Sequence, residues 1–205
     1  MKIGLSTAAF YGKWEVEEAA ALLGRYGAEC AEVFLQTRSE YAREFARLVR
    51  KNLNGVPCTS VQPFGTAFEN EFFARSTRQR ADALDTFRHA LDAAAELGAH
   101  LYVYHGRYSP ARIELPFEQQ RNAEVLTLMQ EEATRRDIHV AWENVCWCQL
   151  TTPKRVSEMR KLLPPEKSNA FCHRAVLFGR DICTARKAHC EICPLESFCP
   201  KKGVK

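Results

Sequence analysis

The chain alternates short apolar runs with longer segments of helical period, and this alternation limits its fold more than any other feature. The apolar runs predict five strands, at 2–7, 31–35, 56–61, 101–104 and 139–142. The segments of helical period predict five helices, at 15–26, 39–54, 77–97, 116–136 and 152–163. Strands alternating with helices form parallel sheets with right-handed crossovers. The sequence therefore predicts an α/β fold, a partial TIM-like barrel of about five of the usual eight βα units.

Local signals mark where the first three helices begin or end. Gly27 and Gly98 follow the first and third helices and predict their C-terminal ends, because glycine readily adopts the left-handed conformation found there. Ser39, with Glu40 and Glu44 nearby, predicts the start of the second helix. These residues support the helix assignments independently of the hydrophobic spacing.

Charge and composition change near residue 163. Residues 1–163 carry 21 basic and 21 acidic side chains, whereas residues 164–205 carry 8 basic and 4 acidic ones. Pro164 and Pro165 stop the preceding helix at this point. We therefore expect a barrel-like domain at 1–163 and a small C-terminal segment at 164–205. The positive charge of the second segment favours contact with a polyanion, although a merely solvated tail has the same composition.

Four of the nine cysteines follow the pattern C-x6-C-x2-C-x5-C near the C-terminus: Cys183, Cys190, Cys193 and Cys199. Thiolates at this spacing can surround one centre, because short loops cost little closure entropy and thiolates bind iron and zinc tightly. The pattern predicts an iron–sulfur site, with a four-thiolate zinc site as the alternative. The other five lie in apolar or strand-like segments and are expected to be structural: Cys30, Cys58, Cys146, Cys148 and Cys172.

The cysteines also bear on where the protein works. An odd number cannot pair completely in disulfides, and the sequence shows no apolar leader and no apolar run of membrane length. We therefore expect a reducing, cytoplasmic setting and no contact with a membrane.

Polar residues follow three of the predicted strands. Gln62 comes after the third strand, His105 after the fourth and Glu143, followed by Asn144, after the fifth. The carboxyl ends of barrel strands carry the active site in TIM barrels, and a carboxylate there suits a divalent metal or a cationic partner. The alternatives are a hydrogen-bonded core histidine at 105 and a loop cap or ion-pair partner at 143.

Three segments of the body are similar to the xylose-isomerase-like sugar phosphate isomerase/epimerase superfamily of TIM barrels. They are Met-Lys-Ile-Gly-Leu-Ser-Thr at 1–7, Tyr-Val-Tyr-His-Gly at 102–106 and Trp-Glu-Asn-Val at 142–145. The resemblance implies that residues 1–163 match the first five βα units, that Glu143 is a metal ligand and proton-transfer residue, and that His105 lines the site. Members usually complete the metal site from their last three strands, and many have histidine where Gln62 stands. The resemblance therefore implies an incomplete catalytic site.

The C-terminal segment resembles the end of endonuclease III, the DNA glycosylase/AP lyase family of base excision repair. The similar stretches are Pro-Glu-Lys at 165–167, Cys-His-Arg-Ala-Val-Leu-Phe-Gly-Arg at 172–180 and the cysteine loop at 183–199. The resemblance implies a [4Fe-4S] cluster on all four loop cysteines. Arg186 and Lys187 lie inside the loop and are expected to contact DNA phosphates. The sequence contains no Leu-Pro-Gly-Val-Gly hairpin, so glycosylase activity is not assigned to any residue.

Two hypotheses follow from the sequence. The main one is a [4Fe-4S] protein that binds DNA and lacks complete glycosylase machinery. The alternative is a metal-dependent sugar phosphate isomerase or epimerase with Glu143 and His105 in its site. An open five-unit barrel exposes strand edges, which predicts self-association or a partner that covers the open edge.

Overall fold

The computed structural model describes residues 3–109, 118–145 and 147–149, together with Lys154, Ser157 and Glu191. The chain divides into two compact units, residues 1–151 and 152–205, and nearly all described residues belong to the first. The expected domain boundary at 163/164 lies outside the described residues, as does nearly all of the expected helix at 152–163. Both stay predictions.

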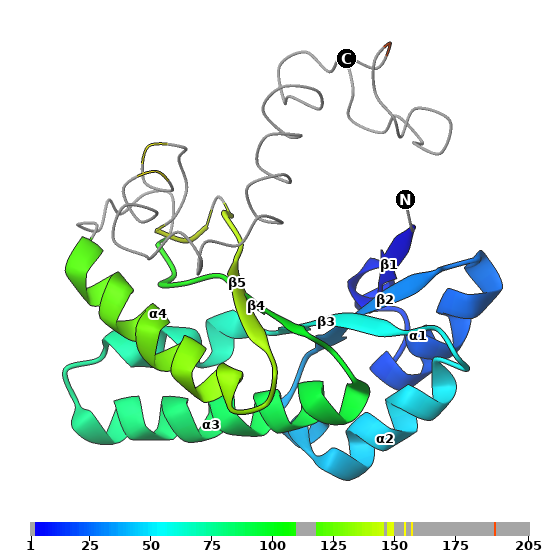
Figure 1. The fold of residues 1–205 in the computed structure, drawn as a ribbon, viewed down its shortest axis with the longest axis horizontal. Coiled ribbons are helices and arrows are strands. Elements are labelled where there is room, and N and C mark those ends of the chain that lie inside the picture. Colours follow the sequence, from blue (N-terminus) through cyan, green and yellow to red (C-terminus); the bar gives the residue numbers. More distant parts are fainter. Residues whose placement is uncertain are drawn as a thin grey trace. The chain divides into compact units, whose positions relative to one another are not determined.

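Five strands form one parallel sheet in chain order, β1-β2-β3-β4-β5 (Figure 1). They are β1 (Gly4–Ser6), β2 (Cys30–Leu35), β3 (Cys58–Pro63), β4 (Leu101–Tyr104) and β5 (His139–Trp142). The connecting helices are α1 (Val16–Leu23), α2 (Arg43–Asn52), α3 (Thr77–Leu97) and α4 (Gln119–Thr134). The parallel α/β class, the five strands and the first four helices are confirmed.

The helix ends agree with the sequence in two places and differ in one. Gly27 and Gly98 adopt positive φ angles of 76° and 80°, as expected of glycines that end helices. The second helix does not start at Ser39. Thr37 and Glu40 form a reciprocal capping box on a short 3-10 helix, Arg38–Tyr41, and α2 begins only after the extended residue Ala42. The capping box starts this short helix, and the extended residue Ala42 ends it before α2 begins, so the sequence prediction merged two elements.

The core lies between the sheet and the helices. The ring of Phe87 on α3 packs edge-on against Tyr102 of β4, with centroids 4.9 Å apart, and against Phe72 at 6.1 Å. Small buried side chains on the same helix face let α3 approach the sheet closely: Ala83, Ala90, Ala93 and Ala94. Cys58 and Cys148 are buried in this unit, consistent with their expected structural role. The aromatic contact between α3 and β4 therefore anchors the longest helix.

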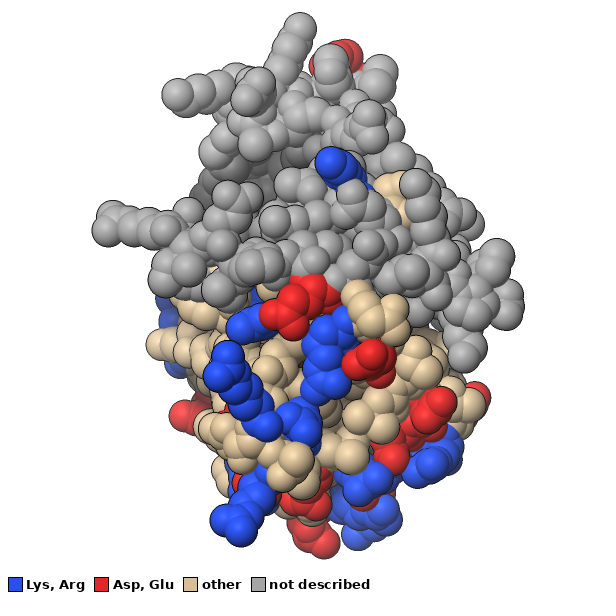
Figure 2. All heavy atoms as spheres, turned by 90° about the vertical axis from the view of Figure 1, so that its left-hand side faces the viewer, with Lys and Arg blue, Asp and Glu red and all other residues tan. Residues whose placement is uncertain are grey.

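Ion pairs join neighbouring helices. Arg43 on α2 pairs with Asp92 on α3, and Arg88 on α3 pairs with Glu132 on α4 at 2.7 Å. Arg136 also pairs with Asp92. Figure 2, which shows the side of the molecule where α4 lies, shows acidic and basic side chains mixed over its described part. That part of the face therefore carries no continuous patch of positive or negative charge. Among the described helices, none is both long and apolar enough to cross a membrane.

The opposite face of the sheet is lined by alternate residues of each strand. The register pairs Glu32 with Ser60, and Phe34 with Gln62, on this face. Ser60 donates a hydrogen bond to Glu32 at 3.0 Å across the strands. Glu32 and Gln62 are half-buried. In a closed barrel this face would be the interior, whereas here, among the described residues, β1 pairs only with β2 and β5 only with β4.

Replacing Phe87 with alanine tests the α3–β4 contact. Phe87 is fully buried, so Phe87→Ala is expected to lower the free energy of unfolding by about 3–5 kcal/mol, since it removes a large ring and leaves a cavity. Urea denaturation followed by circular dichroism measures the change. The matched control is Phe64→Ala, because Phe64 is 39% exposed and should cost clearly less. Equal losses in both variants would contradict the assigned core.

Candidate active site

Three polar side chains meet at the carboxyl ends of β3, β4 and β5. Gln62 lies near the end of β3, while His105 and Glu143 directly follow β4 and β5. The Nε2 atom of His105 lies 2.9 Å from Nε2 of Gln62 and 3.4 Å from Oε2 of Glu143. Because neighbouring parallel strands end at the same edge, residues far apart in sequence share one site. The structure thus brings together the three residues that the sequence singled out in the body.

These three residues differ in their access to solvent. His105 is 5% exposed, whereas the side chain of Glu143 is 50% exposed. The Nδ1 atom of His105 is buried and has no hydrogen-bond partner among the described residues. The arrangement leaves a carboxylate at the surface and an imidazole behind it.

A fourth group, Glu69, was not anticipated from the sequence. It lies on a 3-10 helix, η5 (Glu69–Phe73), in the connection after β3, and is 1% exposed. Its Oε2 atom lies 3.8 Å from Nδ1 of His105, beyond hydrogen-bond reach, and accepts hydrogen bonds from the backbone N–H groups of His105 and Gly106. A glutamate between the apolar residues Phe68 and Phe72 was the available signal, since an acidic residue in such a stretch is either exposed or specifically bound.

The backbone at the end of β4 is held in an unusual conformation. Gly106 has a φ of 86°, and a Cβ atom there would lie 2.9 Å from Nε1 of Trp142. That same Nε1 donates a hydrogen bond of 3.0 Å to the carbonyl oxygen of His105. A residue other than glycine at 106 would meet both a strained backbone and the indole ring. The turn that carries His105 is therefore fixed by its sequence and by β5.

Opposing effects act on the charge of His105. Burial disfavours the charged imidazole, but the carboxylates of Glu143 and Glu69 outweigh burial and raise the pKa of His105 to about 9. His105 is therefore protonated at neutral pH when the site holds no other cation. A protonated imidazole donates hydrogen bonds from both ring nitrogens, so the amide oxygen of Gln62 is the end that would face it.

The donor set at this edge suits a divalent cation in part. Carboxylate oxygen and imidazole nitrogen are common ligands, and Glu143 and His105 supply one of each. Among the described residues no group of three or more His, Cys, Asp or Glu side chains could hold a metal ion. Glu143 therefore fits as one ligand of an incomplete shell, and further ligands must come from elsewhere.

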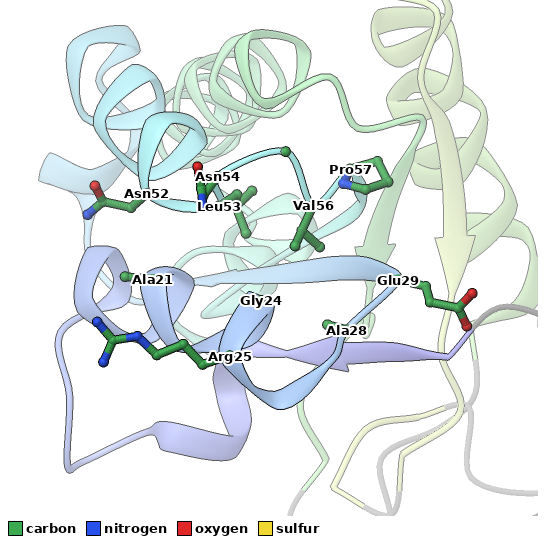
Figure 3. A pocket seen from close by; sticks show the side chains of 11 residues that line it. Ala21, Gly24, Arg25, Ala28, Glu29, Asn52, Leu53, Asn54, Val56 and Pro57 are labelled. Carbon is green, nitrogen blue, oxygen red and sulfur yellow. The ribbon is translucent and has the colours of Figure 1, made fainter.

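A hollow among the described residues does not coincide with this site. A depression of about 660 Å³ lies among the connections that precede β2 and β3, at the opposite edge of the sheet (Figure 3). Small or aliphatic side chains and backbone form much of its wall, and Arg25 and Glu29 lie at opposite sides of the view. In TIM barrels this edge contributes to stability, and chemistry takes place at the carboxyl ends of the strands. The depression is therefore not the candidate site.

The predicted residues of the C-terminal segment lie outside the described residues. They are the loop cysteines and the two basic residues between the first two of them: Cys183, Cys190, Cys193, Cys199, Arg186 and Lys187. The expected [4Fe-4S] cluster and the expected DNA contacts stay predictions.

The charge of His105 gives a test by titration. In the chelator-treated chain, NMR should show His105 losing its proton at about pH 9, and Glu143→Gln should lower this pKa because it removes a carboxylate that stabilises the charged ring. A raised pKa stabilises the folded state fully below the ordinary value of 6.5, and this stability is lost as the pH rises toward 9. Titration near 6.5 in both proteins would contradict the assigned environment.

Comparison with known proteins identifies the family of the barrel-like unit. Residues 18–170 match the family model described as a xylose isomerase-like TIM barrel. No curated protein sequence matches the chain. Among solved structures, the fold is similar to that of D-allulose 3-epimerase from Methylomonas sp., with 13% identity, a TM-score of 0.62 and coverage of 79% of this chain and 58% of that one.

Other solved structures show the same likeness. The IOLI protein with a bound zinc atom has 15% identity and a TM-score of 0.61, with 78% of this chain and 58% of that one covered. The 3-keto-D-glucoside 4-epimerase YcjR from E. coli has 17% identity and a TM-score of 0.58, with 79% and 63% covered. The chain spans about three fifths of the length of these neighbours. By the match to its family model, the chain belongs to the xylose isomerase-like TIM barrel family.

Proposed function

We propose that the body of this chain carries part of a metal-assisted sugar isomerase or epimerase site, with Glu143 and His105 as its acting residues. The observation that supports this most is the convergence of Gln62, His105 and Glu143 at the carboxyl ends of three neighbouring strands. The family match and the epimerases among the similar structures favour it over the iron–sulfur hypothesis, which the sequence had placed first.

The two acting residues have complementary properties. Glu143 is half exposed and can accept a proton from the carbon beside a sugar carbonyl and return it to the former carbonyl carbon, which isomerises the sugar. Epimerisation would also need an acid on the opposite face of the substrate carbon, supplied from outside the described residues. As the C–H bond breaks, its electron pair moves toward the carbonyl oxygen. The His105 imidazole can donate a hydrogen bond to that oxygen from the buried side. Gln62 orients the imidazole through its amide.

A divalent cation would fit beside Glu143. When bound, such an ion supplies polarisation of the substrate carbonyl. The described residues offer an incomplete ligand shell, so activity requires ligands from outside them. A second copy of this chain, or a partner that covers the open edges of β1 and β5, would bring such ligands.

Manganese binding tests the role of Glu143. Mn²⁺ prefers oxygen and imidazole ligands, so it discriminates against the thiolates of the C-terminal segment. The full chain is expected to bind Mn²⁺, and Glu143→Gln to weaken that binding by at least about tenfold, measured by electron paramagnetic resonance. The matched control is Glu131→Gln, which removes the same charge from an exposed position on α4.

The results separate the site from general charge effects. Equal loss of Mn²⁺ affinity in both variants would mean that binding of the ion depends on the overall charge of the chain and not on a site at Glu143. Unchanged binding in Glu143→Gln would remove Glu143 from the metal site and overturn the metal-assisted form of the proposal.

A second candidate function rests on the cysteine spacing in the C-terminal segment. We propose that Cys183, Cys190, Cys193 and Cys199 hold a [4Fe-4S] cluster, and that Arg186 and Lys187 contact DNA phosphates beside it. The spacing C-x6-C-x2-C-x5-C supports the cluster whatever the body does, because the four thiolates form a complete ligand set.

Metal analysis after anaerobic purification tests the cluster. About four irons and four sulfides per chain are expected, with the visible absorption lost in Cys190→Ser and kept in Cys30→Ser, which changes a cysteine of the body. One zinc without sulfide would replace the cluster with a zinc site. The absence of both metals would overturn either form of this second function.

A further inference from the structure

Side chains of η5, in the connection after β3, contact the loop that follows β4. Glu69 accepts hydrogen bonds from the backbone N–H groups of His105 and Gly106, at 3.1 and 3.2 Å. The next residue, Asn70, accepts one from the N–H of Tyr108 at 2.6 Å. Phe73 on the same element lies under the guanidinium of Arg107, 5.7 Å from ring centre to Cζ. Three side chains of one short helix therefore contact four consecutive residues that begin with His105.

The fold leaves room for the Glu69 carboxylate at one specific point. A Cβ atom built on Gly65 would lie only 2.5 Å from Cδ and 2.6 Å from both carboxylate oxygens of Glu69. Gly65 shows no positive φ, so its backbone conformation does not explain the glycine. The close approach of the carboxylate does.

A buried carboxylate is an expensive way to stabilise a fold. Taking the charge out of water costs several kcal/mol, and well-packed apolar side chains of similar volume often stabilise a protein as well or better. Glu69 is 1% exposed, and its described partners are the turn at 105–106 and the hydroxyl of Tyr102, which lies 3.5 Å away. Its contacts are thus concentrated on the backbone that carries the imidazole.

The main chain of His105 is held from two sides. The Glu69 carboxylate accepts a hydrogen bond from the N–H of His105, and the indole N–H of Trp142 donates one to the carbonyl oxygen of His105 at 3.0 Å. With both peptide groups fixed, the imidazole is directed to Gln62 and Glu143 at its Nε2 end. The Nδ1 end faces the Glu69 carboxylate.

From this geometry we propose that Glu69 is a positioning residue of the candidate site: it fixes the His105–Gly106 turn and so sets the direction of the His105 ring. The importance of this role for catalysis rests on the proposed function. The positioning itself does not, because it concerns contacts within this chain.

Four variants of the full chain test the proposal. Glu69→Leu removes both acceptor oxygens, and Glu69→Gln keeps one. Gly65→Ala leaves every charge in place but pushes the carboxylate aside. Glu71→Leu is the matched control, since Glu71 lies on the same helix, and no hydrogen bond joins its side chain to His105 or Gly106 in the described structure.

Amide hydrogen exchange and ring nitrogen NMR provide the readouts. In Glu69→Leu, exchange of the His105 and Gly106 amide protons is expected to accelerate about tenfold or more, because their charged acceptor is lost. Glu69→Gln should restore protection at both amides, because both N–H groups donate to the same oxygen, Oε2, and glutamine keeps one oxygen there. The ring nitrogen shifts of His105 should move in Glu69→Leu and Gly65→Ala and stay unchanged in Glu71→Leu.

A purely structural role would give a different pattern. If Glu69 only supported the fold, the melting temperature would fall while, in the folded protein, the ring shifts and local exchange at 105–106 stayed as in the parent. Should Glu69→Leu fail to fold, Gly65→Ala decides, and parent-like exchange and ring shifts in that variant would overturn the proposal. Where isomerase activity is measurable, kcat is expected to fall with little change in KM. Without activity, exchange and ring shifts still decide the positioning role.

Discussion

All five strands run in the same direction, and the position of every candidate site residue depends on this constraint. A parallel strand must be followed by a crossover, so each strand delivers its last residue to one edge of the sheet and its connecting helix to one face. Gln62, His105 and Glu143 are separated by about forty residues along the chain, yet they meet because they end neighbouring strands. Packing of α3 on β4 through Phe87 and Tyr102 then fixes the central strand of the three.

The site combines a rigid interior with an accessible exterior. His105 is buried and held by hydrogen bonds at its backbone N–H and carbonyl, whereas Glu143 has half of its side chain exposed. Carboxylates on both sides of the ring keep its pKa high despite burial. Such a pairing suits proton transfer, because the donor stays in place while the acceptor can meet a ligand.

The sequence predicted those parts of the structure that depend on local pattern. Strand positions followed from apolar runs, and Gly27 and Gly98 marked helix ends because the positive φ they adopt is a local requirement. Ser39 was a wrong start because the capping box at Thr37 and Glu40 starts a separate short helix, which hydrophobic spacing does not reveal. Glu69 was missed for a different reason. Its contacts join the connection after β3 to the backbone at residues 105 and 106. Such a tertiary contact leaves no periodic pattern in the sequence.

Gly65 has a consequence for how such chains diverge. A methyl group at this position and the Glu69 carboxylate in its present position exclude one another in space. Each position alone would look unremarkable, a small residue in a loop and an acid between phenylalanines. The two positions are therefore expected to vary together. Relatives that keep the acid at 69 are expected to keep the glycine at 65. Relatives with a larger residue at 65 are expected to stabilise the turn at their histidine through other contacts. Relatives with substitutions at both 65 and 69 would therefore be those in which different contacts stabilise that turn.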